Sequence, residues 1–593
     1  MENVYGGQTG NVILTRLFRK AELSWAVFAF SGAVSPIVDL MFISLFIGSE
    51  GVTVMGYVSP LIMLSALVGS YIICGARNEV STLLGAGKID EANSVFSASV
   101  FLGGGLSLIT AVAVGIFCSG VSVILGVRDP QILEMTKLYI SGNIIGLPFF
   151  SLIQILRAYL QMEGQYHRVS MISILITVID IAADAFVVFV LHGGIFGLAL
   201  ATSVGYIIPF FVGAEFFMRK KHNSVFRLSH KGLNLKICCK IMHLGSPAAV
   251  IKGSNAVGGI LINNMLTALN IRYLVAAYGV FAQITVFVSS SWYAPADTLH
   301  AFAGIFIGEE DRNSLKEVQK ISLLHALLWT SIVTALMFVF AVPLTWIFLK
   351  SNDPEALRMS VECIRVSCFS LPFHAIVYNF NNYLMAVKRL RFCNFYSFLI
   401  ECGNIVPITF LMLQLINYPG AWVSKVVNML LLSAIAWFYI SKNNVEGGGY
   451  RDKMLLLPDS FGFSSYYEIS ISANSTDEII DLSRVAVSFA LEHGADMKRA
   501  KTFGLVTEEL ATVIRGHGFN DGKPHNINAR LMAKGEELII RMRDDCEPFN
   551  MIEYYKKVRD DLENGVGMSI IMKQSKDVQH TNTLGTNNLI VRL

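Results

Sequence analysis

Long apolar stretches dominate the first 441 residues of the chain. A stretch of about 20 apolar residues can cross a bilayer as a helix. The first stretch is too long for a signal-peptide core and has no evident small-residue cleavage site, so it counts as a span. The pattern predicts an all-α polytopic membrane body with twelve transmembrane helices, at residues 25–47, 53–76, 94–117, 137–158, 168–191, 195–217, 245–269, 274–297, 321–349, 361–385, 393–416 and 420–441.

The rest of the chain alternates helical and strand periodicities, which is typical of a water-soluble α/β domain. Residues 442–458 include three consecutive glycines and are interpreted as a flexible linker to this domain, residues 459–593. Helices are predicted at 476–493 and 497–516, and strands at 526–532, 537–543, 577–583 and 588–593.

Composition supports this division of the chain. Charged residues make up 15% of the protein, whereas soluble domains contain about 25%. Residues 442–593 hold 41 of the Asp, Glu, Lys and Arg residues, and the 441 residues before them hold 50. A soluble enzyme is therefore excluded for most of the chain. The net charge of +3 gives no case for a nucleic-acid binder, and the nine cysteines include no C-x-x-C pair, so they predict no metal site.

Positive charge marks one side of the predicted membrane body. The connecting segment 219–240 contains seven Lys and Arg residues, and Lys388, Arg389 and Arg391 lie in another segment on the same side. Segments on the opposite side contain few. Positively charged loops stay in the cytoplasm. We therefore expect a multi-pass protein of a prokaryotic cytoplasmic membrane, with both termini in the cytoplasm.

An internal repeat divides the membrane body into two halves. At an offset of 224 residues, 129–160 matches 353–384 at ten of 32 positions without a gap. The shared strings include Asp-Pro and Leu-Pro-Phe, which apolar composition alone does not produce. Each half holds six spans, so the predicted lobes, residues 1–220 and 221–441, run parallel. Transporters built this way bind substrate between the halves and rock them for alternating access.

Acidic residues inside spans are candidates for function, because a carboxylate at the bilayer centre costs about 2.5–3.5 kcal/mol. Asp39 lies on the first span, and Asp180 and Asp184 lie on one face of the fifth. Thr202 on the sixth offers a hydroxyl. Neighbouring carboxylates repel one another when ionised, which suits a proton site, and carboxyl and hydroxyl oxygens also suit sodium. The alternative is that these groups are buried and hydrogen-bonded only to fix helix packing.

The second half offers further candidates. Glu401 and Asn404 lie on the eleventh span, and Asn404 is the repeat-mate of Asp180. Asn263 is the repeat-mate of Asp39, so the second half carries amides where the first carries acids. Lys252 on the seventh span either snorkels to the interface or provides a counter-charge to a cavity acid.

The sequence resembles the multidrug and toxic compound extrusion (MATE) family over roughly residues 13–441. The resemblance rests on Ser35-Pro36, Asp39, Phe46-Ile47-Gly48, the segment 85–92 and the repeat. It extends to Asp184 and Thr202, whereas Asp180 stands where bacterial members have asparagine. The resemblance implies cation-coupled export of bulky, often cationic organic compounds.

The C-terminal domain carries several short motifs in order. They are Glu509 and His517 on one helix, Asp544 to Asn550 after a strand, Gly565-Val566-Gly567 before a helical run, and Gly585-Thr586 before the last strand. Glycines before a helix allow backbone amides to approach a phosphate. This order resembles the histidine-kinase-like ATPase fold, in its anti-sigma-factor serine-kinase branch, and predicts an α/β sandwich.

That second resemblance implies ATP binding by Glu509, Asp544, Gly565, Gly567, Gly585 and Thr586. Asp544 would contact adenine, and Glu509 would act as a base. Val513 stands where the family has its magnesium-binding asparagine, and Cys546 replaces a glycine. The domain therefore reads equally as a degenerate regulatory fold that binds a cytoplasmic protein.

The whole sequence predicts a transporter rather than an enzyme. The predicted protein is a proton- or sodium-coupled antiporter, surrounded by membrane lipid, that exports small organic, typically cationic compounds across the cytoplasmic membrane. It carries a cytoplasmic ATPase-like regulatory domain. The domain lacks a G-x-x-x-x-G-K-[ST] loop, so transport requires no cofactor beyond the coupling ion. Two rivals stay open: a flippase of lipid-linked precursors, and a membrane-anchored anti-sigma-type regulator or sensor.

Overall fold

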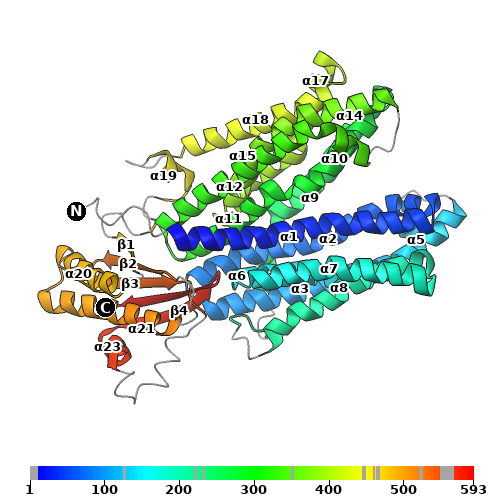
Figure 1. The fold of residues 1–593 in the computed structure, drawn as a ribbon. Helices are drawn as coiled ribbons and strands as arrows, with labels where there is room; N and C mark the ends of the chain where they lie inside the picture. Colours follow the sequence, from blue (N-terminus) through cyan, green and yellow to red (C-terminus); the bar gives the residue numbers. More distant parts are fainter. Residues whose placement is uncertain are drawn as a thin grey trace.

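A computed structural model of the protein describes residues 11–124, 129–219, 224–229, 234–348, 353–443, 449–458, 461–462, 468–473, 475–519, 525–547 and 566–593. Long helices build the body, and a small sheet with its own helices lies at one end of it (Figure 1). The predicted all-α body and the C-terminal α/β domain are therefore both present.

The first half contains eight α-helices and one π-helical turn in its described residues. They are α1 (Asn11–Phe46), α2 (Ser49–Gly85), α3 (Ile89–Ile116), α4 (Cys118–Ile124), α5 (Pro130–Asn143), α6 (Leu147–Met162), α7 (Tyr166–Phe186), η1 (Val187–Leu191) and α8 (Gly194–Met218).

The second half repeats this order. Its elements are α9 (Leu235–Ala268), α10 (Leu274–Val288), α11 (Ser290–Gly308), α12 (Arg312–Val339), α13 (Ala341–Phe348), α14 (Pro354–Ser367), η4 (Cys368–Ser370), α15 (Leu371–Ala386), α16 (Leu390–Phe398), η5 (Leu399–Gly403), α17 (Ile405–Ile416) and α18 (Gly420–Ser441). The starts of α1 and α9, α5 and α14, α6 and α15, and α7 and α16 are each 224 residues apart.

The repeated Asp-Pro string has the same structural role in both halves. Asp129 and Asp353 are N-cap residues whose carboxylates accept backbone N–H groups of α5 and α14. Proline follows at the first helical position, where its missing N–H costs nothing and its fixed φ suits a helix. The string therefore recurs because both helices begin in the same way.

Eight helical segments among the described residues are long and apolar enough to cross a membrane, or up to ten if each bent pair is one span. The bent pairs are α5 with α6, at 42°, and α10 with α11, at 44°. The long helices α2 and α9 fall outside that count. A multi-pass helical body is therefore confirmed, and the number of twelve spans stays a prediction.

The two halves meet along α2, which packs against α9 and α11. Glycines make the approach close: a Cβ atom on Gly75 would lie 1.8 Å from the Ile241 carbonyl oxygen, and one on Gly245 would lie 2.3 Å from that of Tyr71. Small residues allow such contact between membrane helices. Away from the sheet, helices of the two halves diverge (Figure 1).

The C-terminal domain is a five-stranded antiparallel sheet in the order β1-β2-β3-β5-β4, with helices packed on one face. The last four strands and the first two helices of this domain confirm the predicted elements, and β1 was missed. Helix α19 (Tyr450–Met454) precedes the domain. The elements of the domain are β1 (Glu468–Ala473), α20 (Thr476–Glu492), α21 (Met497–Gly518), β2 (Ile527–Lys534), β3 (Glu537–Asp544), α23 (Val566–Gln574), β4 (Asp577–Thr583) and β5 (Thr586–Arg592).

The interpretation of 442–458 as a flexible linker is wrong for its second part. Leu455 and Leu456 are both 1% exposed and pack in the core of the helical body. Tyr383 donates a hydrogen bond of 2.7 Å to the Leu455 carbonyl oxygen, and Arg389 donates one of 2.5 Å to that of Leu456. Two buried leucines cost too much to leave in water, so this segment is anchored.

Candidate functional site

Three carboxylates meet inside the first half. Asp39 of α1 and Asp180 and Asp184 of α7 have oxygen atoms that all lie within 4.8 Å of one another. The three residues are 8%, 2% and 1% exposed. Asp180 and Asp184 share a helical face because they are four residues apart, and α7 packs directly against α1. The structure thus brings together the three acids that the sequence singled out.

Several oxygen atoms of this carboxylate cluster have no hydrogen-bond partner among the described residues. They are Oδ1 of Asp39, Oδ1 of Asp180 and both carboxyl oxygens of Asp184. The Ser35 hydroxyl is buried beside Asp180. A buried charge without a partner is costly, so such a group either takes up a proton or holds a cation. The donor set consists of hard oxygen ligands, which fit a proton or a small hard cation.

Helix α8 completes the walls of the cluster. Thr202 lies beside Asp180, and its hydroxyl donates a hydrogen bond of 3.3 Å to the Leu198 carbonyl oxygen. A Cβ atom on Gly205 would lie 3.1 Å from the Asp180 Cβ, so glycine lets α8 approach α7 here. Thr202 is therefore at the cluster, as predicted.

Two tyrosines near the carboxylates were missed by the sequence analysis. Tyr139 of α5 and Tyr206 of α8 both interact electrostatically with Asp39 and Asp180. Tyr206 lies four residues after Thr202, and that helical spacing could have indicated it. Nothing in the sequence singled out Tyr139.

The second half contains a cavity of about 450 Å³, and its described residues form no second carboxylate cluster. The cavity wall includes several aromatic side chains and carries one acid, Glu401 on η5. Glu401 accepts hydrogen bonds from Asn255, at 2.7 Å, and from the Tyr378 hydroxyl, at 2.8 Å. The aromatic and histidine side chains of the wall are Tyr278, Phe281, Trp292, Tyr293, His374 and Tyr378. Enclosed apolar cavities with a few polar groups are typical ligand sites.

A lysine already occupies part of this aromatic wall. The Lys425 ammonium lies 4.1 Å from the ring centre of Tyr278 and 4.9 Å from that of Phe281. An ammonium group over an aromatic face is attracted by the ring quadrupole. The cavity therefore has faces that accept positive charge.

The other candidates of the second half are dispersed. Asn404 donates a hydrogen bond of 2.8 Å to Asn428, which lines the cavity. Lys252 is exposed and acts electrostatically on Glu401. Asn263 is exposed on α9 and is not among the residues that line the cavity. Asn263 and Asn404, the repeat-mates of Asp39 and Asp180, therefore do not form a counterpart of the carboxylate cluster.

A buried ionic group joins the two halves. Arg77 Nη1 of α2 lies 2.6 Å from Asp297 Oδ1 of α11, and Arg157 of α6 also interacts with Asp297 electrostatically. The Arg157 guanidinium lies 3.8 Å from the ring centre of Phe28, and its Nε and Nη1 have no hydrogen-bond partner among the described residues. This ionic group was not recognised in the sequence, because Arg77, Arg157 and Asp297 all stand at the ends of predicted spans.

Comparison with known proteins decides the family. A family model described as MatE matches residues 27–186 and 247–410, more than half of the chain. The chain belongs to the MatE family. This confirms the resemblance of the helical body to multidrug and toxic compound extrusion transporters, and the match ends before the C-terminal domain.

Relatives and solved structures agree with the MatE assignment. The Multidrug export protein MepA of Staphylococcus haemolyticus is 23% identical over 419 residues, which are 68% of this chain and 88% of that protein. The MATE transporter VcmN of Vibrio cholerae in its bent form superposes with a TM-score of 0.68 at 16% identity, over 76% of this chain and 98% of VcmN. An outward-facing multidrug resistance MATE family transporter gives 0.66 at 16% identity, over 73% and 97%. The structural likenesses establish the fold.

The predicted nucleotide-site residues of this MatE protein lie at several places in its C-terminal domain. Gly565 lies outside the described residues. Gly567 is in α23, and Glu509 is in the middle of α21. Asp544 ends β3, and burial raises its pKa to about 6 although Asn587 donates it a hydrogen bond of 2.8 Å. Gly585 and Thr586 lie at the β4–β5 turn. A kinase-like ATPase fold is not shown, and nucleotide binding stays a prediction.

Proposed function

We propose that the protein is a cation-coupled secondary antiporter that exports bulky organic compounds, preferentially cations, from the cytoplasm. The carboxylate cluster of Asp39, Asp180 and Asp184 carries this proposal, because buried acids with unpaired oxygens require a proton or a cation. The MepA relative is named for multidrug export, which supports a broad substrate range. Alternating access then exposes the cluster to the two sides in turn.

The coupling ion is a proton or sodium. Three carboxylates so close together repel one another when all are ionised, so uptake of protons lowers the energy of the empty cluster. Sodium would instead be held by carboxylate and hydroxyl oxygens, which Asp39, Asp180, Asp184 and Thr202 supply. The mechanism is the same for either ion: a bound proton or sodium must compensate the negative charge of the carboxylate cluster before the two halves can move.

The aromatic cavity is the proposed substrate site. Glu401 supplies negative charge, and the surrounding rings offer faces to an organic cation. Lys425 rests on two of these rings, so a cationic substrate would displace it from them. Separate sites in the two halves allow substrate and coupling ion to act on the same movement without direct contact.

We place the C-terminal domain in the cytoplasm. The segments around 219–240 and 388–391, which carry the clustered positive charge, support this orientation through the positive-inside rule. A regulatory role for the domain, through a cytoplasmic protein or ATP, belongs to the same proposal.

Purified protein in liposomes tests the transport function. Efflux of fluorescent organic cations is measured under imposed sodium gradients, proton gradients and neither. We expect efflux against the substrate gradient with one of the two ions and none without either. Absence of cation efflux under both gradients would contradict the proposal. Movement of a lipid-linked precursor would then favour the flippase, for which the buried Arg77 and Arg157 provide positive charge, and movement of neither substrate would favour the sensor.

Glu401→Gln is expected to weaken transport of organic cations about tenfold, because it removes a negative charge that attracts the substrate, and opposite charges about 4 Å apart attract by about 1–4 kcal/mol. The amide keeps an oxygen for Asn255 and Tyr378, so the cavity keeps its shape. Apparent KM values for a cationic and an uncharged substrate of similar size are compared in liposomes. An equal rise in apparent KM for both substrates would show that Glu401 maintains the shape of the cavity and does not select for a positively charged substrate.

A further inference from the structure

The C-terminal sheet has one apolar face and one basic face. Along β3, Leu538, Ile540 and Met542 belong to the core that the helices of the domain cover. Arg541 and Arg543 alternate with them and therefore project from the opposite face. That basic face is the one that meets the helical body.

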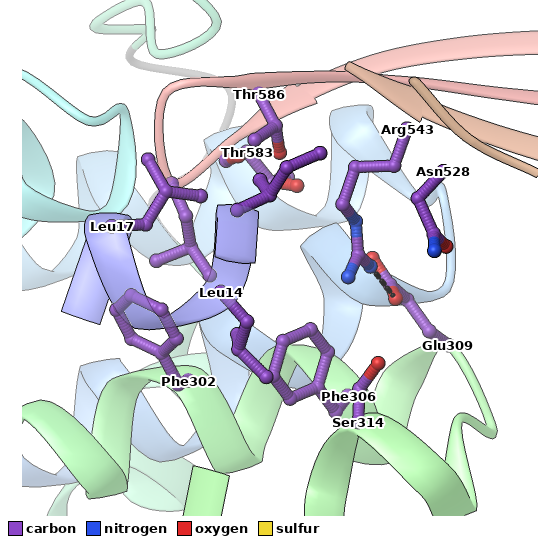
Figure 2. Close-up of a pocket in the computed structure, with 12 residues that line it drawn as sticks. Leu14, Leu17, Phe302, Phe306, Glu309, Ser314, Asn528, Arg543, Thr583 and Thr586 are labelled. Atoms are coloured by element: carbon purple, nitrogen blue, oxygen red, sulfur yellow. Dashed lines mark hydrogen bonds and ion pairs between the residues drawn. The ribbon is translucent and has the colours of Figure 1, made fainter. Parts of the chain in front are cut away.

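The basic face binds the turn between α11 and α12 of the second half. Arg543 Nη2 lies 2.6 Å from Glu309 Oε2 (Figure 2), and Arg541 donates two hydrogen bonds of 3.2 Å to the Glu309 carbonyl oxygen. Arg530 of β2 lies 2.9 Å from Asp311, with both side chains at most 5% exposed. Although burial favours the neutral acid, the three arginines hold the pKa of Asp311 at about 2, so the pair is ionised at neutral pH.

The same domain binds the first half through a different turn. The Leu584 amide of the β4–β5 turn donates a hydrogen bond of 2.7 Å to the Met162 carbonyl oxygen, and Tyr166 donates one of 2.9 Å to the Leu584 carbonyl oxygen. A Cβ atom on Gly164 would lie 2.1 Å from the Gly585 amide nitrogen. Both glycines have positive φ, 73° and 77°, so glycine is needed for the turn and for the close approach.

Helix α1 contacts the C-terminal domain where that domain meets the two halves. Arg16 Nη1 lies 2.7 Å from Asp545 Oδ2. Figure 2 shows Leu14 and Leu17 of α1 between Phe302 of α11 and the β4–β5 turn with Thr583. The cavity among them measures only about 30 Å³, room for about one water molecule. The domain therefore packs against both halves at once.

We propose that the C-terminal sheet is an intramolecular docking module, which clamps the two halves together at its own end of the molecule and so limits the rate of transport. The clamp rests on the proposed transport function, because alternating access requires the halves to move relative to one another. A domain bonded to Glu309 and Asp311 of one half and to Met162 and Tyr166 of the other opposes that movement.

The contacts between the C-terminal sheet and the two halves can break and re-form. Breaking a buried ion pair is costly when one charge stays buried, but undocking returns both partners to water and avoids that cost. The anchored segment around Leu455 stays on the second half, where Asp452 of α19 pairs with Arg312 at 3.1 Å and Lys316 at 2.5 Å. An undocked sheet thus stays tethered close to its binding surface, and the high effective concentration favours redocking.

A chain that ends at Pro458 tests the clamp, because it keeps the anchored segment and removes only the docked domain. We expect its initial efflux rate in liposomes to exceed that of the full chain about fivefold, the lower end of typical coupling between sites. Glu309→Arg and Arg543→Glu should each accelerate efflux similarly, and the double variant should restore the original rate by re-forming the pair in reverse. Arg484→Glu, at an exposed position of α20, serves as the matched charge reversal that leaves the rate unchanged.

A second measurement does not need transport. Spin labels at Lys88 and Arg391, exposed residues of the two halves, report the separation of the halves. The background replaces the cysteines that are not buried, Cys74, Cys118, Cys238 and Cys239, by serine. We expect a narrow distance distribution in the full chain and a broader, longer one in the chain ending at Pro458. If the truncated chain moves substrate at the original rate or more slowly, or if the distances are unchanged, the clamp is refuted. If the full chain shows no efflux but the distances broaden in the chain ending at Pro458, the transport function is refuted and the clamp between the halves is not.

Discussion

Asp184→Asn and Asp39→Asn are each expected to abolish gradient-driven export while the protein still inserts in the membrane. Both carboxylates are buried beside Asp180, and their unpaired oxygens are the groups that a proton or cation would compensate. An amide keeps the size of the side chain but neither takes up a proton nor supplies negative charge. The change therefore removes the ion-dependent step and spares the packing of α1 against α7.

The expected effect is large. Removing one partner of a buried charge interaction costs about 2–5 kcal/mol, and 2 kcal/mol already corresponds to about 30-fold in affinity. Efflux under an imposed sodium or proton gradient should fall by about that factor or more. Glu134→Gln, which neutralises an exposed acid on α5, is the matched control and should transport normally. Wild-type rates for both cluster variants would show that the acids are structural and that coupling lies elsewhere.

The carboxylate cluster could be predicted from sequence because its signal is local and chemically rare. Two acids four residues apart in an apolar stretch must share a helical face, and acids are costly enough inside a bilayer to attract attention. The internal repeat could also be predicted from the sequence, since Asp129-Pro130 and Asp353-Pro354 stand at the starts of helices that begin in the same way. Both inferences needed no knowledge of distant contacts.

The aromatic cavity could not be predicted in the same way. Its wall combines side chains from α9, α10, α11, α15, η5 and α18, and each aromatic residue alone reads as ordinary packing in an apolar helix. The repeat was misleading for Asn263, because a repeated backbone does not require repeated side-chain contacts. Its position corresponds to that of Asp39, yet it is exposed.

The docked C-terminal domain shows a different limit of the sequence. Three glycines predicted a flexible connection, and the buried pair Leu455 and Leu456 that follows was given no weight. Arg530, Arg541 and Arg543 were not singled out in the sequence, since charged residues on an amphipathic strand usually face water. Their partners, Glu309 and Asp311, are more than 200 residues away in the chain, so only the fold pairs them.

Asp297→Asn is expected to destabilise the whole protein strongly, because it leaves two arginines between the halves without a buried counter-charge. Arg77 lies 2.6 Å from Asp297, and the two side chains are 5% and 19% exposed, while Arg157 is 6% exposed. Breaking a buried pair by removing one partner costs about 3–5 kcal/mol. Thermal unfolding in detergent should therefore shift to markedly lower temperature, with a lower yield of folded protein.

Two further variants separate the loss of charge balance from a simple loss of contact. Asp297→Asn combined with Arg77→Met removes both charges of the pair, and it should recover much of the stability, since apolar replacement of a buried pair is often neutral. Glu362→Gln breaks an exposed ion pair, in which the side chains of Arg358 and Glu362 are 64% and 41% exposed. It should lower the free energy of unfolding by well under about 1 kcal/mol. If Asp297→Asn unfolds no earlier than Glu362→Gln, the arginines between the halves are solvated in the membrane, and the ionic group does not hold the halves together.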